Sequence, residues 1–516
     1  MNLPPDTKWD VIIVGGGGSG LAAGVSCAEH GLKVLLLEKR PQPGGTTGIA
    51  VGSFTASGTS HQRRNGIDDN PLDHQEDAAK FARSDIEAAG NSELRGFLLR
   101  HAADTLDWLE TMGLRFHGPS PEPPNRVPRM HNVVPSARAY IGALQMRFLR
   151  LGGHIVTSAC VKELIRTNGR VIGVSADVSG TTRVETSKRG VVLAAGDYAA
   201  NAQMIAEYKG QAFAAVEGIN PHATGDGHRL AASAGGQLLN MSITYGPELR
   251  FLPPKRRRFP RLWTSNVMAA RLMGALLPIV PRFLINAVIK RLLVTWQHPE
   301  DALMADGAIL INIHGRRFCN ELACPGRENA VAGQPEKVAY ILLDETLIRR
   351  YSAWPHFIST APEIAYAYVD DYLRLRPDVA IAADSLELLA AQRKLPPKEL
   401  VEAVAGTRHS DDVPVLARPL SGNRWVLLGP VKAYFTTTEG GAAIDTSFRV
   451  LDEGGQPISG LYAIGQNGLG GQILWGHGLH IAWAITSGRL VGDVLGKSER
   501  QDVETAHCKS GSTDGQ

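Results

Sequence analysis

The sequence predicts an α/β fold in which a Rossmann-like dinucleotide-binding domain with a parallel sheet carries an inserted α+β capping domain. Three observations support this prediction. A glycine-rich turn joins a strand to a helix near the N-terminus, and apolar strands that end in glycine occur both early and late in the chain. With 516 residues, the chain also exceeds the size of a single hydrophobic core, so we expect at least two domains.

The first strand and its turn lie in residues 10–20, DVIIVGGGGSG. Val11–Val14 is a short apolar run rich in β-branched residues, which is typical of a buried parallel strand. Gly15, Gly17 and Gly20 then form the pattern G-x-G-x-x-G. The first glycine permits a tight turn, the second lets the backbone approach a pyrophosphate, and the third lets helix and strand pack closely. The phosphate charge would lie at the helix N-terminus.

The second strand, Lys33–Leu37, ends at Glu38, whose carboxylate is placed to accept a hydrogen bond from a ribose hydroxyl. Strand, glycines, helix, strand and acid thus follow one another in the order of a dinucleotide site. A glycine-rich turn without a ligand would leave Glu38 unexplained. We therefore predict dinucleotide binding.

Further glycine-ended segments indicate how the domains are arranged along the chain. Gly190–Asn201 and Gly460–Gly478 are apolar strands that close on glycine, and Gly218–Met241 contains a turn followed by a helical pattern. Because such strands occur at both ends, we predict one dinucleotide-binding domain from two separated segments. The predicted boundaries are 1–240 and 430–516 for this domain and 241–429 for the inserted capping and substrate domain.

Composition and charge exclude several classes of function. With 43% hydrophobic and 20% charged residues the chain resembles an ordinary globular enzyme, and a net charge of +3 is too slight to indicate a nucleic-acid partner. The five cysteines form no CxxC motif and no Cys/His cluster, so we expect no metal site. The first strand begins by residue 11 and leaves no room for a signal peptide, so we expect a cytoplasmic protein.

An apolar segment departs from this background. The basic run Lys255–Arg258 is followed by the apolar segment Leu272–Val294, which Pro278, Pro281 and Arg282 interrupt, so it is a poor transmembrane helix. Three interpretations are open. The segment forms buried or inter-domain helices, or an amphipathic lid that contacts a membrane surface or admits a lipophilic substrate, or an oligomer contact. The second interpretation predicts peripheral membrane association.

Five motifs, in this order, resemble the flavoprotein family of soluble fumarate reductases, 3-ketosteroid Δ1-dehydrogenases and urocanate reductase-like enzymes. They are the glycine turn with Glu38, Pro43–Thr47 (PGGTT), Val191–Asn201 (VVLAAGDYAAN), Ala223–Gly227 (ATGDG) and Gly460–Gln466 (GLYAIGQ). The resemblance covers nearly the whole chain and implies FAD as the cofactor.

The resemblance also implies how FAD is held. Membrane-bound succinate dehydrogenases carry a flavin-linking histidine just after the glycine pair, whereas Thr46 and Thr47 stand there in this chain, so we expect non-covalent FAD. The residues that it places around FAD are Gly15, Gly17, Gly18, Ser19, Gly20, Glu38, Lys39, Gly45, Thr46, Thr47, Gly48, Val161, Ala195, Gly196, Asp226, Gly465, Gln466, Gly478 and Ile481.

A second segment resembles the part of these enzymes that carries the proton-transfer group. In Gly307–Asn329, Arg327 follows Glu321 at a longer spacing than the arginine of fumarate reductases or the tyrosine of ketosteroid dehydrogenases. The resemblance makes Arg327 a candidate acid/base or substrate-binding group. The structural alternative is a salt bridge to Glu328 or Glu321.

The C-terminal glycine pair resembles that of the ketosteroid dehydrogenases, in which a backbone N–H polarises the substrate ketone. Gly478 occupies that place, and His477 is a candidate for carbonyl polarisation or for protonation near the flavin. A structural role for His477, and for His480, is the alternative. Tyr245, near the position of a family histidine, competes with Arg327 for the proton transfer.

The carboxylate clamp of the fumarate reductases is missing from this sequence. Thr437, Trp475 and Pro247 stand where the resemblance places a histidine, an arginine and a second histidine. An anionic dicarboxylate would therefore be poorly compensated, so fumarate and succinate are poor candidates.

These observations favour an FAD-dependent oxidoreductase that acts on a CH–CH bond next to a carbonyl group, by desaturation or reduction. The expected substrate is apolar, such as a cyclic or steroid-like ketone, and an unidentified acceptor or donor exchanges electrons with the enzyme. One alternative is an enoate reductase that holds a single carboxylate on Arg327. Another is a membrane-attached electron-transfer flavoprotein subunit.

Overall fold

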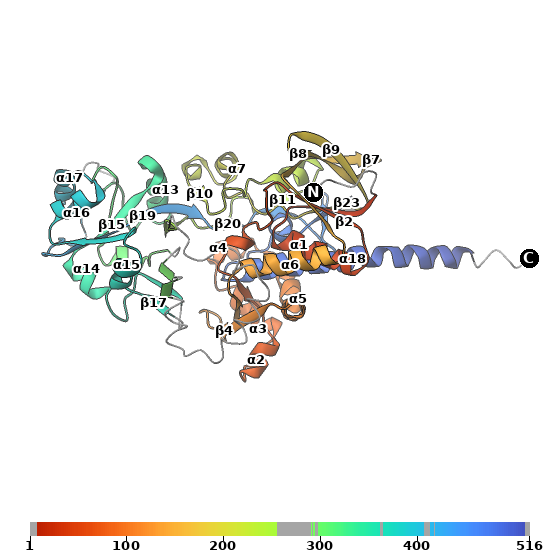
Figure 1. Ribbon diagram of the computed structural model, residues 1–516, viewed down its shortest axis with the longest axis horizontal. Helices are drawn as coiled ribbons and strands as arrows, with labels where there is room; N and C mark the ends of the chain where they lie inside the picture. Colours follow the sequence, from red (N-terminus) through yellow and green to blue (C-terminus); the bar gives the residue numbers. More distant parts are fainter. Residues whose placement is uncertain are drawn as a thin grey trace, which may run out of the picture.

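The computed structural model describes residues 8–254, 290–291, 293–294, 298–361, 365–406, 413–416 and 418–510, with side chains up to residue 497. Figure 1 shows two lobes along the long axis, one around α1 and one around β15 and β19. The basic run Lys255–Arg258 and almost all of Leu272–Val294 lie outside the described residues. The three interpretations of that segment therefore stay predictions.

The first lobe contains an eight-stranded sheet with the main order β22-β23-β9-β1-β2-β6. β1 pairs in parallel with β2 and β9, and β6 and β23 extend the parallel part on either side. The run Val11–Val14 is buried throughout, as expected for a strand covered on both faces. The strands are β1 (Trp9–Val14), β2 (Val34–Glu38), β6 (His154–Thr157), β7 (Ala159–Thr167), β8 (Arg170–Val178), β9 (Thr181–Leu193), β22 (Arg449–Leu451) and β23 (Pro457–Ala463).

The last helix packs closely against the first. α18 (Leu479–Ser510) lies beside α1 (Gly18–Glu29), and three glycines at intervals of one helical turn make the contact possible. A Cβ at Gly488 would lie 2.4 Å from the Ser19 carbonyl oxygen, and a Cβ at Gly492 would lie 2.3 Å from Ser26 Oγ. Gly496 approaches His30 in the same way. Since later residues of α18 contact later residues of the α1 segment, the two helices run in parallel.

The second lobe contains a six-stranded sheet in which β19 pairs with β10, β13, β15 and β18. β10 precedes residue 241, the predicted start of the insertion, and the domain boundaries remain a prediction. The strands are β10 (Glu217–Gly218), β13 (Glu248–Phe251), β14 (Ile309–Ile311), β15 (Ala339–Leu343), β18 (Ala380–Ala383) and β19 (Trp425–Phe435). The helices are α12 (Ala302–Ala305), α13 (Gly326–Ala332), α14 (Glu345–Arg350), α15 (Val369–Leu375), α16 (Leu386–Arg393) and α17 (Pro397–Val404).

A small antiparallel sheet of the order β3-β5-β4 belongs to the first lobe. Its strands are β3 (Ser53–Thr55), β4 (Arg115–Ser120) and β5 (Met130–Val134), and the helices of this part of the chain are α2 (Ser60–Arg64), α3 (Pro71–Ala78), α4 (Ser84–Glu87), α5 (Ser92–Thr111) and α6 (Arg138–Arg150).

Two short ladders bring residues 238–245 beside residues 437–442. β11 (Leu238–Leu239) pairs with β21 (Gly441–Ala442), and β12 (Thr244–Tyr245) pairs with β20 (Thr437–Thr438). These ladders place Tyr245 opposite Thr437. The remaining elements are α7 (Ala202–Tyr208), α8 (Asp226–Ser233), β16 (Ser359–Ala361), β17 (Ala365–Ala367) and the 3₁₀ turns Thr47–Ile49, Gln211–Phe213, Pro335–Lys337 and Gly465–Gly468.

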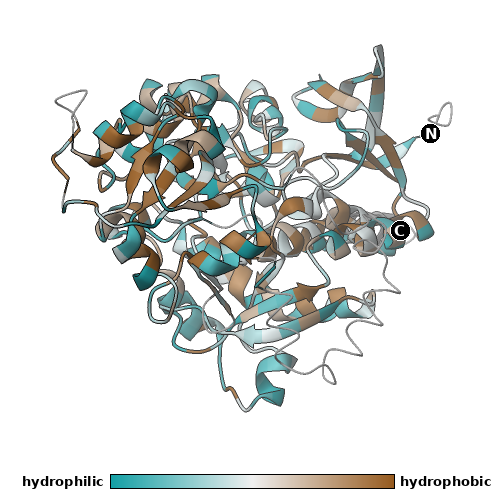
Figure 2. Cartoon of the chain, turned by 60° about the vertical axis from the view of Figure 1, so that its left-hand side comes forward, coloured by the Kyte–Doolittle hydropathy of each residue, from teal (hydrophilic) through white to brown (hydrophobic). Residues whose placement is uncertain are grey.

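Hydrophobic residues gather on the strands and on the inner faces of the helices in both lobes (Figure 2). Each lobe therefore has a core of its own. Among the helices in the described part of the chain, none has the length and apolar character needed to cross a membrane.

Candidate flavin and substrate site

The glycine turn has the close approaches that its sequence predicts. Gly15 has φ +112°, and a Cβ there would lie 2.4 Å from the Ala194 carbonyl oxygen of the neighbouring strand. A Cβ at Gly20 would lie 1.9 Å from the Gly15 carbonyl oxygen. Helix α1 starts at Gly18, so its unpaired N–H groups point toward the space beside the turn. This is the arrangement that binds a pyrophosphate.

Glu38 is the last residue of β2 and is 6% exposed. Its two oxygens accept hydrogen bonds from the backbone N–H of Gly16, at 2.7 Å, and of Arg40, at 2.8 Å. The carboxylate thus lies directly beside the glycine turn, where a ribose would follow the pyrophosphate. It also stabilises the turn itself.

In the described part of the chain, the space beside the glycine turn is open, and an unpaired acceptor lies in the same site. Among the described residues, apart from the adjacent ones in the chain, no atom lies within 4 Å of the position that a Cβ would take at Gly44 or at Gly196, and both glycines have positive φ. Gln466 donates through Nε2 to Thr437 Oγ1 and to the Thr438 carbonyl, while its buried Oε1 meets no partner within the described residues. An acceptor of this kind suits a ribitol hydroxyl. The residues present therefore fit FAD.

Several predicted FAD residues are held by contacts with distant parts of the chain. Lys39 Nζ donates to Thr224 Oγ1 and to Asp226 Oδ2, both at 2.7 Å, and so joins the end of β2 to the start of α8. Asn220 Nδ2 donates to Thr46 Oγ1 at 2.9 Å. Residues 45–48 therefore lie beside the glycine turn, where a Cβ at Gly18 would come within 2.7 Å of Thr47 Oγ1.

Asn467, which sequence reasoning did not identify, connects the other predicted FAD segments. Its Oδ1 accepts from the Ala195 N–H at 2.6 Å, and its Nδ2 donates to the Gly196 carbonyl at 2.8 Å. Ser487 Oγ accepts from the Gly465 N–H at 3.0 Å. The remaining predicted FAD residues lie on β7 (Val161) and α18 (Ile481).

Gly478 directly precedes α18 and has φ +93°. A Cβ there would lie 2.8 Å from Thr55 Oγ1 and 2.9 Å from the Ser53 carbonyl oxygen, so only glycine fits. Within the described residues, the Gly478 N–H donates to no protein acceptor. It is thus available to a ligand.

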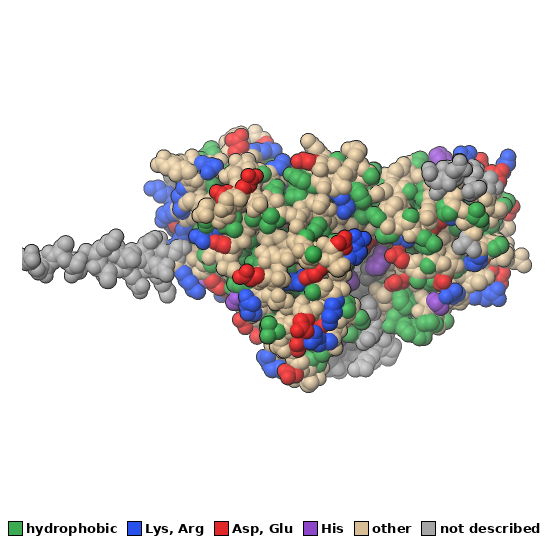
Figure 3. All heavy atoms as spheres, turned by 180° about the vertical axis from the view of Figure 1, so that it is seen from behind, with side chains coloured by type: hydrophobic (Ala, Val, Ile, Leu, Met, Phe, Trp, Pro, Cys, Tyr) green, Lys and Arg blue, Asp and Glu red, His purple; other side chains and the backbone are tan. Residues whose placement is uncertain are grey.

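His477 is hydrogen-bonded to Glu122, a residue that the sequence did not identify. Glu122 Oε1 accepts from the His477 backbone N–H at 2.7 Å and lies 2.5 Å from His477 Nδ1. The hydrogen bond to Glu122 raises the pKa of His477 above its ordinary value. The imidazole side chain is 59% exposed, so its Nε2 is accessible. The space-filling view shows histidine side chains in the hollow between the lobes (Figure 3).

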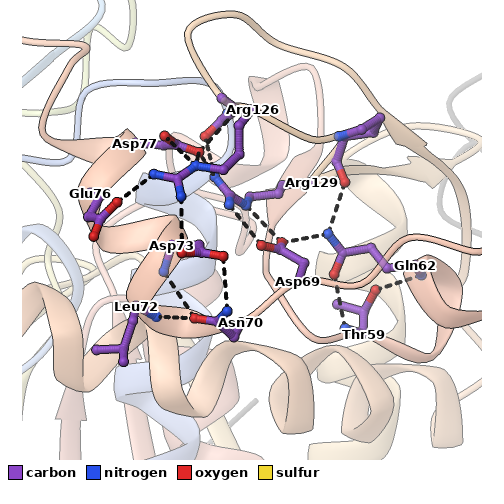
Figure 4. Close-up of polar contacts among 12 residues, drawn as sticks. Thr59, Gln62, Asp69, Asn70, Leu72, Asp73, Glu76, Asp77, Arg126 and Arg129 are labelled. Atoms are coloured by element: carbon purple, nitrogen blue, oxygen red, sulfur yellow. Dashed lines mark hydrogen bonds and ion pairs between the residues drawn. The ribbon is translucent and has the colours of Figure 1, made fainter.

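A buried ion-pair network fixes the loop that carries Glu122 (Figure 4). Arg129 is fully buried and donates to Asp69 at 2.8 Å and to Asp77 at 2.7 Å, while Arg126 donates to Asp77 at 3.0 Å. The loop between β4 and β5 is thereby attached to α3. Paired carboxylates and guanidinium groups in this environment hold their geometry because separating them would leave an uncompensated buried charge.

Three aromatic rings and a buried carboxylate lie close to Gly478. The Tyr245 ring centroid lies 5.7 Å from Trp475 and 6.3 Å from His480. His480 Nε2 lies 2.7 Å from Oε1 of Glu439, whose side chain is fully buried. Burial raises the pKa of the Tyr245 phenol above its ordinary value, so the phenol keeps its proton at neutral pH.

Asp197 adds a second buried carboxyl group to this region. It is 1% exposed, and burial raises its pKa to about 6. Thr437 and His480 both lower the pKa of Asp197, against the effect of burial. Neither Asp197 nor Glu439 was identified from the sequence, although Glu439 directly precedes the Gly440–Gly441 pair.

Arg327 lies on α13 and is occupied by protein acceptors. Its Nε donates to Glu328 Oε1 at 2.7 Å, and its Nη2 donates to Asp301 Oδ1 at 2.7 Å. Its Nη1 donates to the Glu321 carbonyl oxygen at 3.2 Å. Although burial alone would lower the pKa of Arg327, the paired carboxylates raise it. The contact with Glu328 is the one that the structural alternative expected.

These features define a dinucleotide-binding oxidoreductase site, with a phosphate turn at one end and a substrate region around Gly478 at the other. In the described parts of the chain, no three His, Cys, Asp or Glu side chains gather in a metal-binding arrangement.

Comparison with known proteins supports this class. The model of the FAD binding domain family matches residues 10–472. A fumarate reductase (cytochrome) of Shewanella frigidimarina is 28% identical over 525 residues, which cover 97% of this chain and 79% of the relative. The open conformation of a flavocytochrome c3 fumarate reductase superposes with a TM-score of 0.70 at 23% identity, over 96% of this chain and 79% of that chain. A 3-ketosteroid Δ1-dehydrogenase from Sterolibacterium denitrificans gives a TM-score of 0.62 at 19% identity, over 95% of this chain and 100% of that chain.

The chain therefore belongs to the FAD binding domain family. Its cofactor is FAD, and it is an FAD-dependent oxidoreductase that acts on CH–CH bonds. The predicted fold class, cofactor and enzyme class are confirmed, as is the resemblance to both fumarate reductases and ketosteroid dehydrogenases. The site residues, the non-covalent attachment and the substrate remain predictions.

The variant Glu38→Gln should weaken FAD binding about tenfold, because a hydrogen bond to a charged acceptor contributes roughly 1.5–3 kcal/mol. The amide keeps the size of the side chain and one acceptor for the Gly16 N–H. The dissociation constant is measured by flavin fluorescence during reconstitution of the apoprotein. Glu163→Gln, an exposed position on β7, is the control and should bind FAD like the wild type. Equal affinity in Glu38→Gln would remove Glu38 from the site.

The variant Glu122→Gln should lower the melting temperature in a pH-dependent way. Because the pKa of His477 is raised in the folded protein, its pairing with Glu122 stabilises the fold fully below about pH 6.5 and loses this effect as the pH rises through the raised pKa. Thermal unfolding of both proteins between pH 5.5 and 9 measures the difference. A difference that stays constant over this range would contradict the pairing.

Proposed function

We propose that this enzyme exchanges hydrogen with a CH–CH bond next to the carbonyl group of an uncharged, apolar ring substrate, such as a cyclic or steroid-like ketone. The observation that carries the proposal is the Gly478 N–H, which has no acceptor within the described residues. A backbone N–H held in this way can polarise a ketone oxygen and so stabilise negative charge on it. Carbonyl polarisation activates the neighbouring carbon–carbon bond.

The charge around Gly478 favours an uncharged substrate. Glu122 and Glu439 lie within hydrogen-bond distance of His477 and His480, and the buried Asp197 adds a third carboxyl group. A substrate carboxylate would lie beside these carboxyl groups, so its burial there would be costly.

The position of Arg327 argues against the enoate alternative. An arginine that grips a substrate carboxylate needs free N–H groups, but the guanidinium of Arg327 already donates to Glu328, Asp301 and the Glu321 carbonyl. A bidentate contact to a substrate would have to displace these acceptors.

When bound, FAD supplies the flavin ring that gives or takes the hydride at the substrate β-carbon. The protein supplies the remaining contacts. The Gly478 N–H holds the carbonyl oxygen, and the Tyr245 phenol holds a proton that it can give to the α-carbon.

The electron partner and the cellular location also belong to the proposal. We expect a separate donor or acceptor, and an enzyme in the cytoplasm whose contact with a membrane, if the apolar segment Leu272–Val294 makes one, is peripheral. Flotation of the purified protein with liposomes distinguishes this enzyme from a membrane-attached electron-transfer subunit.

The proton-transfer group is tested with the variants Tyr245→Phe and Arg327→Lys in the FAD-loaded protein. If Tyr245 transfers the proton, Tyr245→Phe should lose about 10²–10⁴-fold in turnover of a cyclic enone, since general acid catalysis has this size. Reduction of the flavin by an artificial donor should be unchanged. Stopped-flow spectroscopy measures both half-reactions.

Arg327→Lys provides the comparison. It keeps the charge but not the planar fork that serves three acceptors, so we expect reduced stability with turnover close to the wild type. Loss of turnover in Arg327→Lys together with full activity in Tyr245→Phe would assign the proton transfer to Arg327 instead.

A further inference from the structure

We propose that Trp475 and His480 together bind a hydroxyl group of the substrate beside the Tyr245 ring. This inference rests on the proposed function and adds a second polar group to the expected ring ketone. Three observations support it: the contact of His480 with Glu439, the Trp475 donor that is unpaired within the described residues, and the position of both rings against Tyr245.

Glu439 determines which nitrogen of His480 is available. Its side chain is fully buried, and its Oε1 lies 2.7 Å from His480 Nε2. An ionised carboxylate can only accept, so the Nε2 of His480 carries the hydrogen in this contact. In the neutral imidazole, Nδ1 is then an acceptor. Within the described residues, Nδ1 has no hydrogen-bond partner, and the His480 side chain is 23% exposed.

Trp475 supplies a donor close by. Its Nε1 is buried and meets no acceptor within the described residues. The indole N–H can only donate, and a buried donor without a partner costs roughly 1–3 kcal/mol. A ligand oxygen at this place would recover that cost.

The rings that carry the donor and the acceptor both pack against the Tyr245 ring. Trp475 meets the Tyr245 ring edge-on, with centroids 5.7 Å apart and an interplanar angle of 80°. His480 meets the same ring at 6.3 Å and 65°. A hydroxyl group is both acceptor and donor, so it can accept from Trp475 Nε1–H and donate to His480 Nδ1. A ketone or an ether can make only the first contact.

The predicted ligand is therefore a ring compound that carries a hydroxyl group as well as the carbonyl-activated bond. The aromatic rings of Tyr245 and Trp475 suit its apolar body. The buried Glu439 fixes the His480 tautomer and so acts as a positioning residue.

The inference is tested by binding of two matched probes to the FAD-loaded full chain. The probes are 4-(4-hydroxyphenyl)but-3-en-2-one and its 4-methoxy counterpart, and the change in the flavin absorption spectrum reports binding. We expect the hydroxyl probe to bind about tenfold more tightly, which is the size of one or two hydrogen bonds. The ratio of the dissociation constants of the two probes should fall to about one in both His480→Ala and Trp475→Phe.

Glu439→Gln and His314→Ala complete the design. Glu439→Gln should reduce the preference for the hydroxyl probe, because the amide can donate to His480 Nε2 and so allow the other imidazole tautomer to form. His314 is exposed and lies far from His480 in the sequence, so His314→Ala should leave the preference for the hydroxyl probe unchanged.

The outcomes separate this inference from the proposed function. Equal binding of both probes by the wild type, or a preference that persists in His480→Ala and Trp475→Phe, would overturn the hydroxyl site and leave the ring-ketone proposal standing. If neither probe perturbs the flavin spectrum at any concentration, both are wrong. The Trp475→Phe variant decides the matter if His480→Ala does not fold.

Discussion

The parallel contact between α1 and α18 sets the geometry on which the whole site depends. The glycines Gly488, Gly492 and Gly496 let the two helices approach until side-chain and backbone atoms touch, so neither helix can slide along the other without a clash. α1 begins at the phosphate turn, and Gly488 of α18 contacts Ser19 in the first turn of α1. Gly478 precedes Gly488 by ten residues, so at 1.5 Å per residue it lies roughly 15 Å away along the helix direction, on the far side of the start of α1. A dinucleotide cofactor needs a separation of this kind between its pyrophosphate and its reactive ring.

Aromatic rings and buried carboxyl groups give the proposed substrate region its character. Tyr245 and Trp475 provide flat apolar surfaces, and Glu439 and Glu122 each hold one histidine in a fixed orientation. Each of these contacts fixes the direction in which its imidazole can form further hydrogen bonds. The region therefore discriminates by shape and by hydrogen-bond pattern.

The sequence predicted the strands beside the glycine turn far better than the contacts between residues that are distant in the chain. Val11–Val14 and Lys33–Leu37 match β1 and β2 almost to the residue, because a glycine-rich turn between two buried strands is a local pattern. Glu122 and His477 are distant in the sequence, and nothing in the proline-rich segment around Glu122 indicates the contact. The antiparallel extension β7–β9 was also not predicted, since its strands are only half buried and alternate weakly. Contacts that depend on the tertiary fold leave no short-range signal.

The buried network around Arg129 has a consequence for how the enzyme responds to its surroundings. Mobile ions screen charges that face water, but they do not reach a guanidinium that is enclosed with Asp69 and Asp77. The ion pairs that Arg129 contributes to the attachment of the loop between β4 and β5 are thus screened much less by dissolved salt than exposed pairs. Because this loop carries the carboxylate that orients His477, the shape of the substrate region is expected to be the same in dilute and in concentrated electrolyte. We expect selectivity built on such a support to depend less on ionic strength than selectivity that arises from charges at the surface.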